Sequence, residues 1–417
     1  MLEFIQEILN IGAAVMLPVV MTILGIVLGM GFAKPIRAGL IIGIGFTGLN
    51  LAVGLLMTTI APAIGYYESL NSSRFTTVDM GWAAMGAAVW SVPFAALAIL
   101  LIVVVNVVLI LLRWTKVLNV DIWNYIHFLI PGTLVYALTG SAVLGLIATV
   151  GFSVVSLFVG QRLAPKWQST FNLPGTTVTT FSFITFAYPL GWALNALFDK
   201  IPKVRDIDLS MEKVSKRLGL FGDTAFIGLF VGVLLGVLTR QSWQGVLTMG
   251  VGIAAVLVLL PRMVSIMMEG LSAIGTGAQV FMKKRLKRDS ELYIGMDIAL
   301  SLGGSGVVAV GVLLIPLSIL FAFIIPGMSY FPIGLLTVAP YLVPMFALAS
   351  GGNLFRTLIS SAIFLFIVEF LANVFAPEAT AMMSATGVAV SGQVTDAFFG
   401  FNPANVIISA IHALFGR

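Results

Sequence analysis

A small number of ionisable and polar side chains interrupt a sequence that is otherwise apolar. Asp79 and Trp82 lie in the segment VDMGW, where a carboxylate could accept hydrogen bonds from solute hydroxyls and an indole could cover a carbon chain. An aspartate is also an ordinary helix N-cap, and tryptophan is enriched at membrane interfaces. The segment therefore predicts either a site for a sugar or polyol, or a capped helix at a membrane surface.

Asp297 and His127 offer proton chemistry. Asp297 opens the segment DIALSLGG and could accept the proton of an attacking hydroxyl, or it could simply cap a helix. His127 ends the segment DIWNYIH, which also holds Asp121 and Asn124. An imidazole titrates near neutral pH and can relay protons, but a single histidine can also satisfy a buried hydrogen bond. Both alternatives stay open for each residue.

Further polar side chains lie within or beside long apolar runs, where ionisable groups usually face a bundle interior or a water-filled path. Arg356 could pair with a carboxylate or phosphate together with Asn353, one helical turn earlier, or it could snorkel to an interface. Glu369 lies too deep in its run to snorkel easily. The other candidates are Asn50, Asn195, Gln393, Asp396 and Asn405.

Several kinds of chemistry lack their sequence signatures. The chain has no cysteine, which excludes disulfides, thiolate metal sites and a cysteine nucleophile. It has no P-loop, no HExxH motif and no dinucleotide fingerprint in a suitable context. A formal charge of +5 over 417 residues does not suggest nucleic acid. We therefore expect no bound cofactor, no metal and no nucleic-acid partner.

The elements that position these residues are predicted to be membrane-spanning helices. Hydrophobic residues make up 59% of the chain, charged residues only 9%, and the mean hydropathy is +1.08. A spanning helix needs about 20 apolar residues, and the apolar runs predict roughly ten or eleven spans in an all-α polytopic protein. A lipid-exposed backbone admits only helices or closed barrels, and the alternating pattern of a barrel does not dominate. The uncharged runs are 38–67, 80–112, 167–198, 241–261 and 298–355, the last long enough for two spans.

One hydrophilic stretch divides the chain. Residues 199–223 are predicted to form a cytosolic amphipathic connector between a first transmembrane half, 1–198, and a second, 224–417. Two halves of similar length are typical of transporters with a structural repeat. Each half also has a Gly/Ser/Thr-rich segment, 173–182 and 384–396, predicted to be a re-entrant hairpin near a solute site. The glycines of 228–236 predict close helix packing, and the basic run 283–288 is predicted to face the cytoplasm.

Six motifs in order resemble the galactitol-type enzyme IIC (EIIC) of the bacterial phosphoenolpyruvate-dependent sugar phosphotransferase system (PTS). They are GIGFTGLNL (43–51), VDMGW, NVDIWNYIH (119–127), DKIPKVRDIDLS, IGMDIALSLGG and GNLFRTLIS. The resemblance implies an inner-membrane permease that binds a sugar alcohol and presents it to a cytosolic EIIB for phosphorylation. It also implies the ascorbate–galactitol superfamily fold, a homodimer whose protomers have a core domain and a V-shaped dimerisation domain built from inverted repeats.

The resemblance suggests roles for individual residues. Asp297 is the candidate catalytic base, with Asp79 as the alternative. The substrate-binding candidates are Asn50, Asp79, Trp82, His127, Thr179, Thr180, Asp297 and Asn353. The chain departs from the family where Gly304 replaces a histidine and where Thr179 and Thr180 replace Pro-His, so polyols or sugars other than galactitol remain open. The resemblance implies that EIIB carries the phosphoryl group on a cysteine and that EIIA carries it on a histidine, so a chain without cysteine would take its phosphoryl group from a separate subunit. The chain would thus be the membrane component of a phosphotransferase complex.

Two other functions use similar sequence features. An ion-coupled secondary transporter would use midplane carboxylates and broken helices but would move its solute unmodified. A channel, or a membrane enzyme acting on lipid, is the other alternative, but the sequence offers it no set of nucleophilic residues. The state of the internal solute separates the first alternative from a PTS permease, and activity in detergent without a soluble partner would favour a lipid enzyme.

Overall fold

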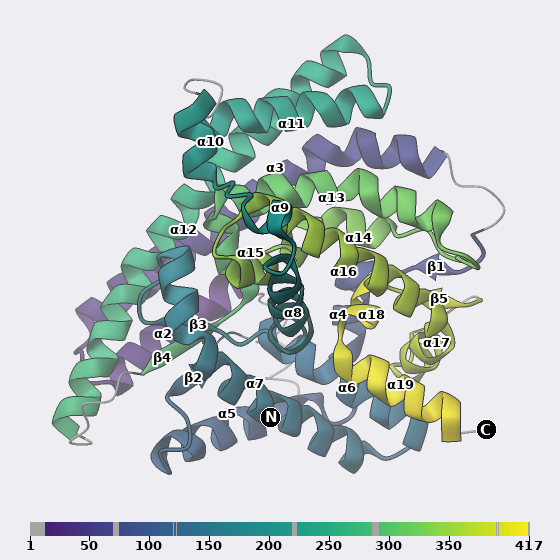
Figure 1. The fold of residues 1–417 in the computed structure, drawn as a ribbon. Coiled ribbons are helices and arrows are strands. Elements are labelled where there is room, and N and C mark those ends of the chain that lie inside the picture. The colour runs from purple at the N-terminus through teal and green to yellow at the C-terminus, as the bar shows by residue number, and fades with distance from the viewer. Residues whose placement is uncertain are drawn as a thin grey trace.

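The computed structural model describes residues 13–69, 75–119, 121, 123–218, 223–285, 292–388, 390 and 392–415. Helices dominate these residues (Figure 1). Five helices contain segments long and apolar enough to cross a membrane: α3 (Ala33–Ser69), α7 (Ala142–Phe171), α12 (Trp243–Arg285), α13 (Ser305–Ile324) and α16 (Leu354–Val374). The prediction of an all-α polytopic membrane protein is confirmed.

Shorter helices account for most of the remaining described residues. Apolar segments of 10–17 residues occur in α2 (Ala13–Val27), α5 (Ala95–Leu111), α8 (Tyr188–Phe198), α11 (Thr224–Leu238), α15 (Pro344–Ser350) and α19 (Pro403–Phe415), each alone or with a neighbouring turn. The others are α4 (Gly81–Val89), α6 (Trp123–Thr139), α9 (Pro202–Arg205), α10 (Met211–Leu218), α14 (Ile333–Val338), α17 (Ala376–Ala385) and α18 (Ala397–Phe401). A π-helical turn, η1 (Phe183–Ala187), precedes α8, and two 3₁₀ turns, η3 (Ile298–Gly303) and η4 (Ala339–Leu342), flank α13 and α14.

Two apolar runs are more broken than the sequence suggested. The run 80–112 is divided between α4 and α5, because a turn over residues 90–94 that contains Pro93 separates them. The run 298–355 contains one helix of spanning length, α13, rather than two. Its remainder forms α14, η4 and α15, where Pro332, Pro340 and Pro344 lie at or next to helix starts and keep each segment short.

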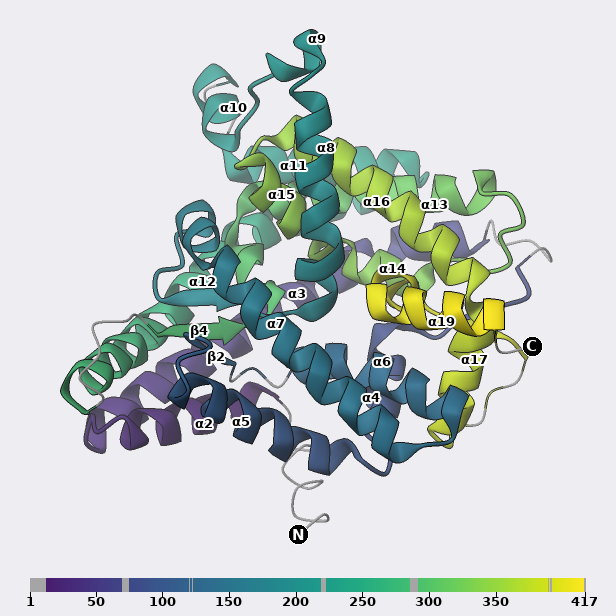
Figure 2. The ribbon, with the colours of Figure 1, turned by 60° about the horizontal axis from the view of Figure 1, so that its bottom comes forward.

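Four helices pack mainly on one another and form what we call the four-helix group. α2 packs on α3, α3 runs along α12, and α11 packs on α12. Figure 2 shows α2 and α12 at one side of the molecule and α17 and α19 at the other. The predicted glycine packing is confirmed, since a Cβ on Gly228 would lie 2.6 Å from Ala254 Cα and one on Gly232 would lie 2.5 Å from Met249 O.

Short parallel strands pair segments from the first half of the sequence with segments from the second half. β2 (Val117–Asn119), β4 (Tyr293–Met296) and β3 (Thr176–Val178) form a three-stranded sheet in the order β2-β4-β3. β1 (Val78–Asp79) pairs with β5 (Val394–Thr395). The two sheets lie on opposite sides of the molecule in Figure 1. Each sheet therefore joins a segment before residue 199 to a segment after residue 223.

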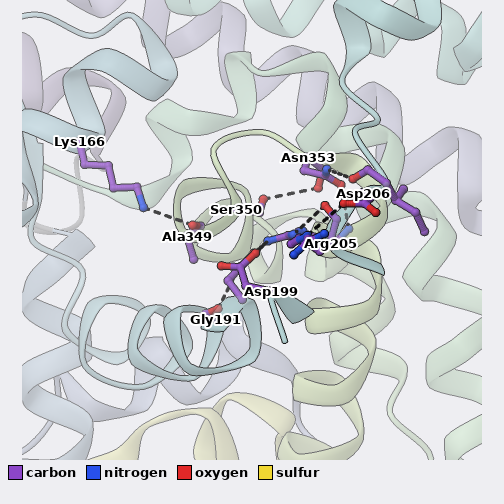
Figure 3. Close-up of polar contacts among 11 residues, drawn as sticks. Lys166, Gly191, Asp199, Arg205, Asp206, Ala349, Ser350 and Asn353 are labelled. Atoms are coloured by element: carbon purple, nitrogen blue, oxygen red, sulfur yellow. Dashed lines mark hydrogen bonds and ion pairs between the residues drawn. The ribbon is translucent and has the colours of Figure 1, made fainter. Parts of the chain in front are cut away.

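The connector is attached to the start of α16. Arg356 Nη1 lies 2.7 Å from Asp199 Oδ1, and Asn353 Nδ2 donates to Ile207 O at 2.7 Å. Figure 3 shows Asp199, Arg205 and Asn353 gathered at this point, with Lys166 bonded to Ala349 beside them. Residues 219–222 and 286–291 lie outside the described residues, and with them the second half of the basic run. The division into 1–198, 199–223 and 224–417 stays a prediction.

Candidate functional site

The three-stranded sheet brings three sequence motifs together. β2, β3 and β4 are parallel, so their carboxyl ends lie at the same edge. Asp121 follows β2, Thr179 and Thr180 follow β3, and Asp297 follows β4. We call these strands and the residues that follow them the Asp297 junction. No local sequence pattern relates these segments, because their strands are separated by up to 176 residues in the chain.

Asp297 uses one half of its carboxylate to begin a helix. Its Oδ1 accepts the Ala299 N–H at 2.8 Å, which caps the turn η3. Its Oδ2 accepts from the Thr180 hydroxyl at 3.1 Å. Its own N–H donates to Asp121 Oδ2 at 3.0 Å. The helix cap and the candidate base are thus compatible, since they use different oxygens.

The Thr180 hydroxyl has more acceptors than hydrogens. Its Oγ1 lies 2.8 Å from Asn124 Oδ1 and 3.1 Å from Asp297 Oδ2, while it also accepts the Ile298 N–H at 2.9 Å. A hydroxyl has one hydrogen, so it can donate to only one of the two oxygens at a time. When Thr180 donates to Asn124, Asp297 Oδ2 is free to accept a hydrogen bond from a solute.

A cavity of about 270 Å³ lies beside Asp297. One wall comes from α3 in the four-helix group, and the other walls come from α4, α6, η1, η3, α14, η4 and α18. Its lining is mostly aromatic and aliphatic, with few polar side chains. The lining residues are Phe46, Leu49, Asn50, Val53, Trp82, Trp123, His127, Phe183, Asp297, Ile298, Ala299, Val338, Tyr341 and Phe398. We call this space the solute cavity.

Stacked rings form one side of the solute cavity. The Trp82 indole stacks on the His127 imidazole with ring centroids 4.7 Å apart and planes 29° from parallel. The centroid of the Phe398 ring lies 4.8 Å from that of the Trp82 ring, which belongs to α4. His127 is 4% exposed, and its Nδ1 lies 3.1 Å from Ser182 Oγ. This bond fixes the imidazole plane that supports the indole.

Four of the eight substrate-binding candidates line the solute cavity: Asn50, Trp82, His127 and Asp297. Thr179 and Thr180 are fully buried behind Asp297, and Thr179 Oγ1 accepts from Asn124 Nδ2 at 2.9 Å. Asn353 caps α16 and holds the connector, away from the cavity lining. Asp79 also lies outside the lining. The structure thus brings together residues from the motifs at 43–51, 78–82, 119–127 and 294–304.

Asp79 belongs to the second sheet, in what we call the Asp79 junction: β1, β5 and the residues that follow them. Its Oδ1 accepts the Gly81 N–H at 3.0 Å and its Oδ2 accepts the Gly334 N–H at 2.9 Å. Asp396 follows β5, caps α18 through its Oδ1, and is 0% exposed. β1 pairs with β5, and the carboxyl groups of Asp79 and Asp396 lie next to each other.

Sequence reasoning missed several lining residues. Trp123, Phe183, Tyr341 and Phe398 are aromatic and look like ordinary membrane residues in the sequence. Only Trp123 carried a signal, because it lies inside the NVDIWNYIH motif. Gly304 lines a separate cavity of about 390 Å³, which Glu269 also lines. Among the described residues, no group of three or more His, Cys, Asp or Glu side chains is arranged to hold a metal ion.

The chain is similar to known proteins over most of its length. Residues 7–393 match the family described as "PTS system sugar-specific permease component". The PTS system galactitol-specific EIIC component of Escherichia coli K12 is 35% identical over 373 residues, covering 89% of this chain and 82% of that protein. The protein of the same name from Escherichia coli O157:H7 gives the same values. Another Escherichia coli K12 protein, named as a permease IIC component with no sugar given, is 32% identical over 386 residues, covering 93% and 88%.

Proposed function

The chain belongs to the family of sugar-specific permease components of the PTS, and from this premise we propose that it binds a sugar alcohol in the solute cavity. As a multi-pass EIIC permease it works with EIIA and EIIB components and a sugar substrate. Galactitol is the solute named for two relatives at 35% identity, so galactitol or a related polyol is the proposed solute. The ion-coupled alternative is not favoured by this family membership.

The observation that carries the proposal is the free half of the Asp297 carboxylate. Asp297 lines the solute cavity. Its Oδ2 accepts a hydrogen bond from Thr180 only while the single hydroxyl hydrogen points to it and not to Asn124 Oδ1. A carboxylate oxygen is a strong acceptor for a hydroxyl, and such charge-assisted bonds are about twice as strong as neutral ones. We assign Asp297 Oδ2 to a hydroxyl of the polyol, while the Trp82 face covers the carbon chain.

The same oxygen is placed for phosphoryl transfer. In the proposed step, a solute hydroxyl attacks the phosphorus of a phosphocysteine on EIIB, the O–P bond forms and the S–P bond breaks. The cysteine leaves as a thiolate, and the hydroxyl proton passes to Asp297. Such reactions depend mainly on positioning and on a group that accepts the proton. The donor lies on EIIB in this proposal because this chain contains no cysteine.

The position of the cavity also suits transport. α3 belongs to the four-helix group, whereas the other walls come from helices outside it. A relative shift of the two sides would open the cavity, which is how alternating access works in many transporters. We further propose a homodimer in the bacterial inner membrane. Its support is the resemblance to galactitol-type EIIC proteins, which implies a dimeric permease. A monomer mass in mild detergent would contradict the dimer.

The proposal is tested by reconstituting the protein in liposomes with its EIIA and EIIB, the general PTS proteins and phosphoenolpyruvate. We expect labelled galactitol or a related polyol to appear as its phosphate. Asp297→Asn keeps the size of the side chain but cannot accept the proton, so phosphorylation should fall by about 100-fold or more.

Asp223→Asn is the matched control, because Asp223 also caps a helix, α11, through its Oδ1 but lies outside the cavity. Its phosphorylation rate should stay close to that of the wild type. Accumulation of unmodified solute without EIIB, driven by a proton gradient, would overturn the phosphotransfer role. Normal phosphorylation by Asp297→Asn would remove Asp297 from the mechanism.

A further inference from the structure

We propose that Asp79 and Asp396 share one proton, and that this shared proton holds Trp82 and Phe398 in place at the wall of the solute cavity. Asp396 is then a positioning residue that makes solute affinity depend on pH. The inference rests on the proposed function only in assigning solute binding to this cavity.

The need for a proton follows from the contacts of the two carboxyl groups. Asp79 accepts two backbone N–H groups, from Gly81 and Gly334. Asp396 Oδ1 accepts the Phe398 N–H at 2.6 Å, and its Oδ2 is buried without an N–H or O–H donor from the described amides and hydroxyls. Asp396 directly follows Thr395, which pairs with Asp79 across the two strands, and its side chain lies beside the carboxyl group of Asp79. Two carboxyl groups can form a hydrogen bond only if one of them carries a proton.

No cation neutralises this pair within the described part of the chain. None of the ion pairs among the described residues includes Asp79 or Asp396. The other ionisable side chains that face the pair are Glu369 on α16 and Tyr330. Ser318 Oγ donates to Glu369 Oε1 at 2.5 Å, whereas Glu369 Oε2 is buried without a hydrogen-bond partner among the described residues. Two adjacent carboxylates that cannot both ionise hold a single proton between them.

The pair is connected to the cavity wall by short stretches of backbone. Trp82 is three residues after Asp79, in the first turn of α4, and Phe398 is two residues after Asp396, in the first turn of α18. Both rings line the solute cavity, and their centroids lie 4.8 Å apart. Because the two aspartates cap the turns that carry these rings, separating the carboxyl groups would separate the rings.

Loss of the shared proton therefore has a defined direction. At alkaline pH both carboxylates become negative and repel each other, so α4 and α18 move apart and the Trp82–Phe398 contact is lost. Solute binding should weaken as pH rises. We expect the dissociation constant of galactitol, or of the polyol that the transport assay identifies, to rise by about tenfold, a typical size for coupling between two sites.

Conservative variants separate this role from simple packing. In Asp396→Asn, the side-chain amide donates to Asp79 at every pH, so binding should be near wild type at neutral pH and should lose its alkaline weakening. Asp396→Ala should bind weakly at all pH values. Glu369→Gln is the matched control, since it removes the nearby third carboxyl group and should keep the alkaline weakening of the wild type.

The experiment measures polyol binding to the full-length purified protein between pH 6 and pH 9 by calorimetry. In parallel, infrared spectra of the ligand-free proteins at neutral pH should show one protonated carboxyl group fewer in Asp396→Asn than in the wild type. Equal alkaline weakening in Asp396→Asn and the wild type, or equal numbers of protonated carboxyl groups, would overturn the inference. If the wild type binds no polyol, the proposed function fails, while the infrared comparison still decides whether the proton is present.

Discussion

The Asp297 junction and the Asp79 junction are built alike but differ in one donor. In the first, Val178 pairs with Met296, and Thr180 and Asp297 follow the strands. In the second, Val394 pairs with Val78, and Asp396 lies two residues after Val394 just as Thr180 lies two residues after Val178. The first junction therefore places a hydroxyl against its aspartate, and the second places a carboxyl group.

This difference gives the two junctions different chemistry. A threonine hydroxyl donates without titrating, so the aspartate beside it can remain an ionised acceptor. A carboxyl group donates only while it holds a proton. The junction with the hydroxyl is also the one whose aspartate lines the solute cavity, whereas Asp79 and Asp396 lie behind the cavity wall. One junction is thus suited to accept a solute hydroxyl, and the other to hold helices together.

The largest effect should come from replacing the Thr180 hydroxyl of the Asp297 junction with a carboxyl group, like that of Asp396 in the Asp79 junction. Thr180→Asp would add a further carboxyl group, besides that of Asp121, beside Asp297 in a buried position, where an uncompensated charge costs about 3–5 kcal/mol. We expect polyol phosphorylation in reconstituted liposomes to fall by about 100-fold at neutral pH, with partial recovery at acidic pH as the new pair gains a shared proton.

Thr180→Asn controls for the size of this substitution, because its amide can donate to Asp297 without titrating. It should be less impaired than Thr180→Asp and should show no recovery at acidic pH. An acid recovery in both variants, or in neither, would contradict the idea that the donor alone distinguishes the junctions.

A smaller effect is expected when the first junction loses its donor. Thr180→Val removes the hydrogen bond to Asp297 and leaves the Ile298 N–H without its acceptor. Hydrogen bonds to charged groups contribute about 1.5–3 kcal/mol, so we expect the rate of phosphorylation to fall by about tenfold or more. Thr180→Ser, which keeps the hydroxyl, should restore most of the rate. If the valine and serine variants behaved alike, the Thr180 hydroxyl would have no role beyond filling space.

The sequence predicted the class of the fold well, for a physical reason. Apolar length and the lack of charge decide whether a segment can lie in lipid, and both are local properties of the chain. The same criterion failed to find the turn between α4 and α5 and the short helices after α13, because proline breaks a helix without changing its hydropathy. The basic run 283–288 could not be compared fully, since 286–288 lie outside the described residues.

The candidate site was only partly predictable. Asn50, Trp82, His127 and Asp297 could be chosen because polar or amphipathic side chains are rare in such a sequence. Asp79 has the same local pattern as Asp297, an aspartate ahead of a helix start, yet it lies behind the wall. What separates the two is the strand that each pairs with, β5 or β3, and that pairing is a long-range contact with no local signal. Phe398 was missed for the same reason.

The smallest predicted effect tests the ring support on each side of the cavity. Ser182 lies four residues after Val178, and Phe398 lies four residues after Val394, so the two occupy equivalent places in their junctions. Phe398 contacts Trp82 directly, whereas Ser182 acts through His127 Nδ1 at 3.1 Å. Ser182→Ala removes one neutral hydrogen bond of about 0.5–1.5 kcal/mol, so polyol affinity should fall by about threefold with little change in the phosphorylation rate at saturation. Ser182 supports the Trp82 ring only through His127, whereas Phe398 contacts that ring directly, so Phe398→Ala should weaken polyol binding more than Ser182→Ala. The reverse order would show that the solute contacts the His127 imidazole and not the Trp82 indole.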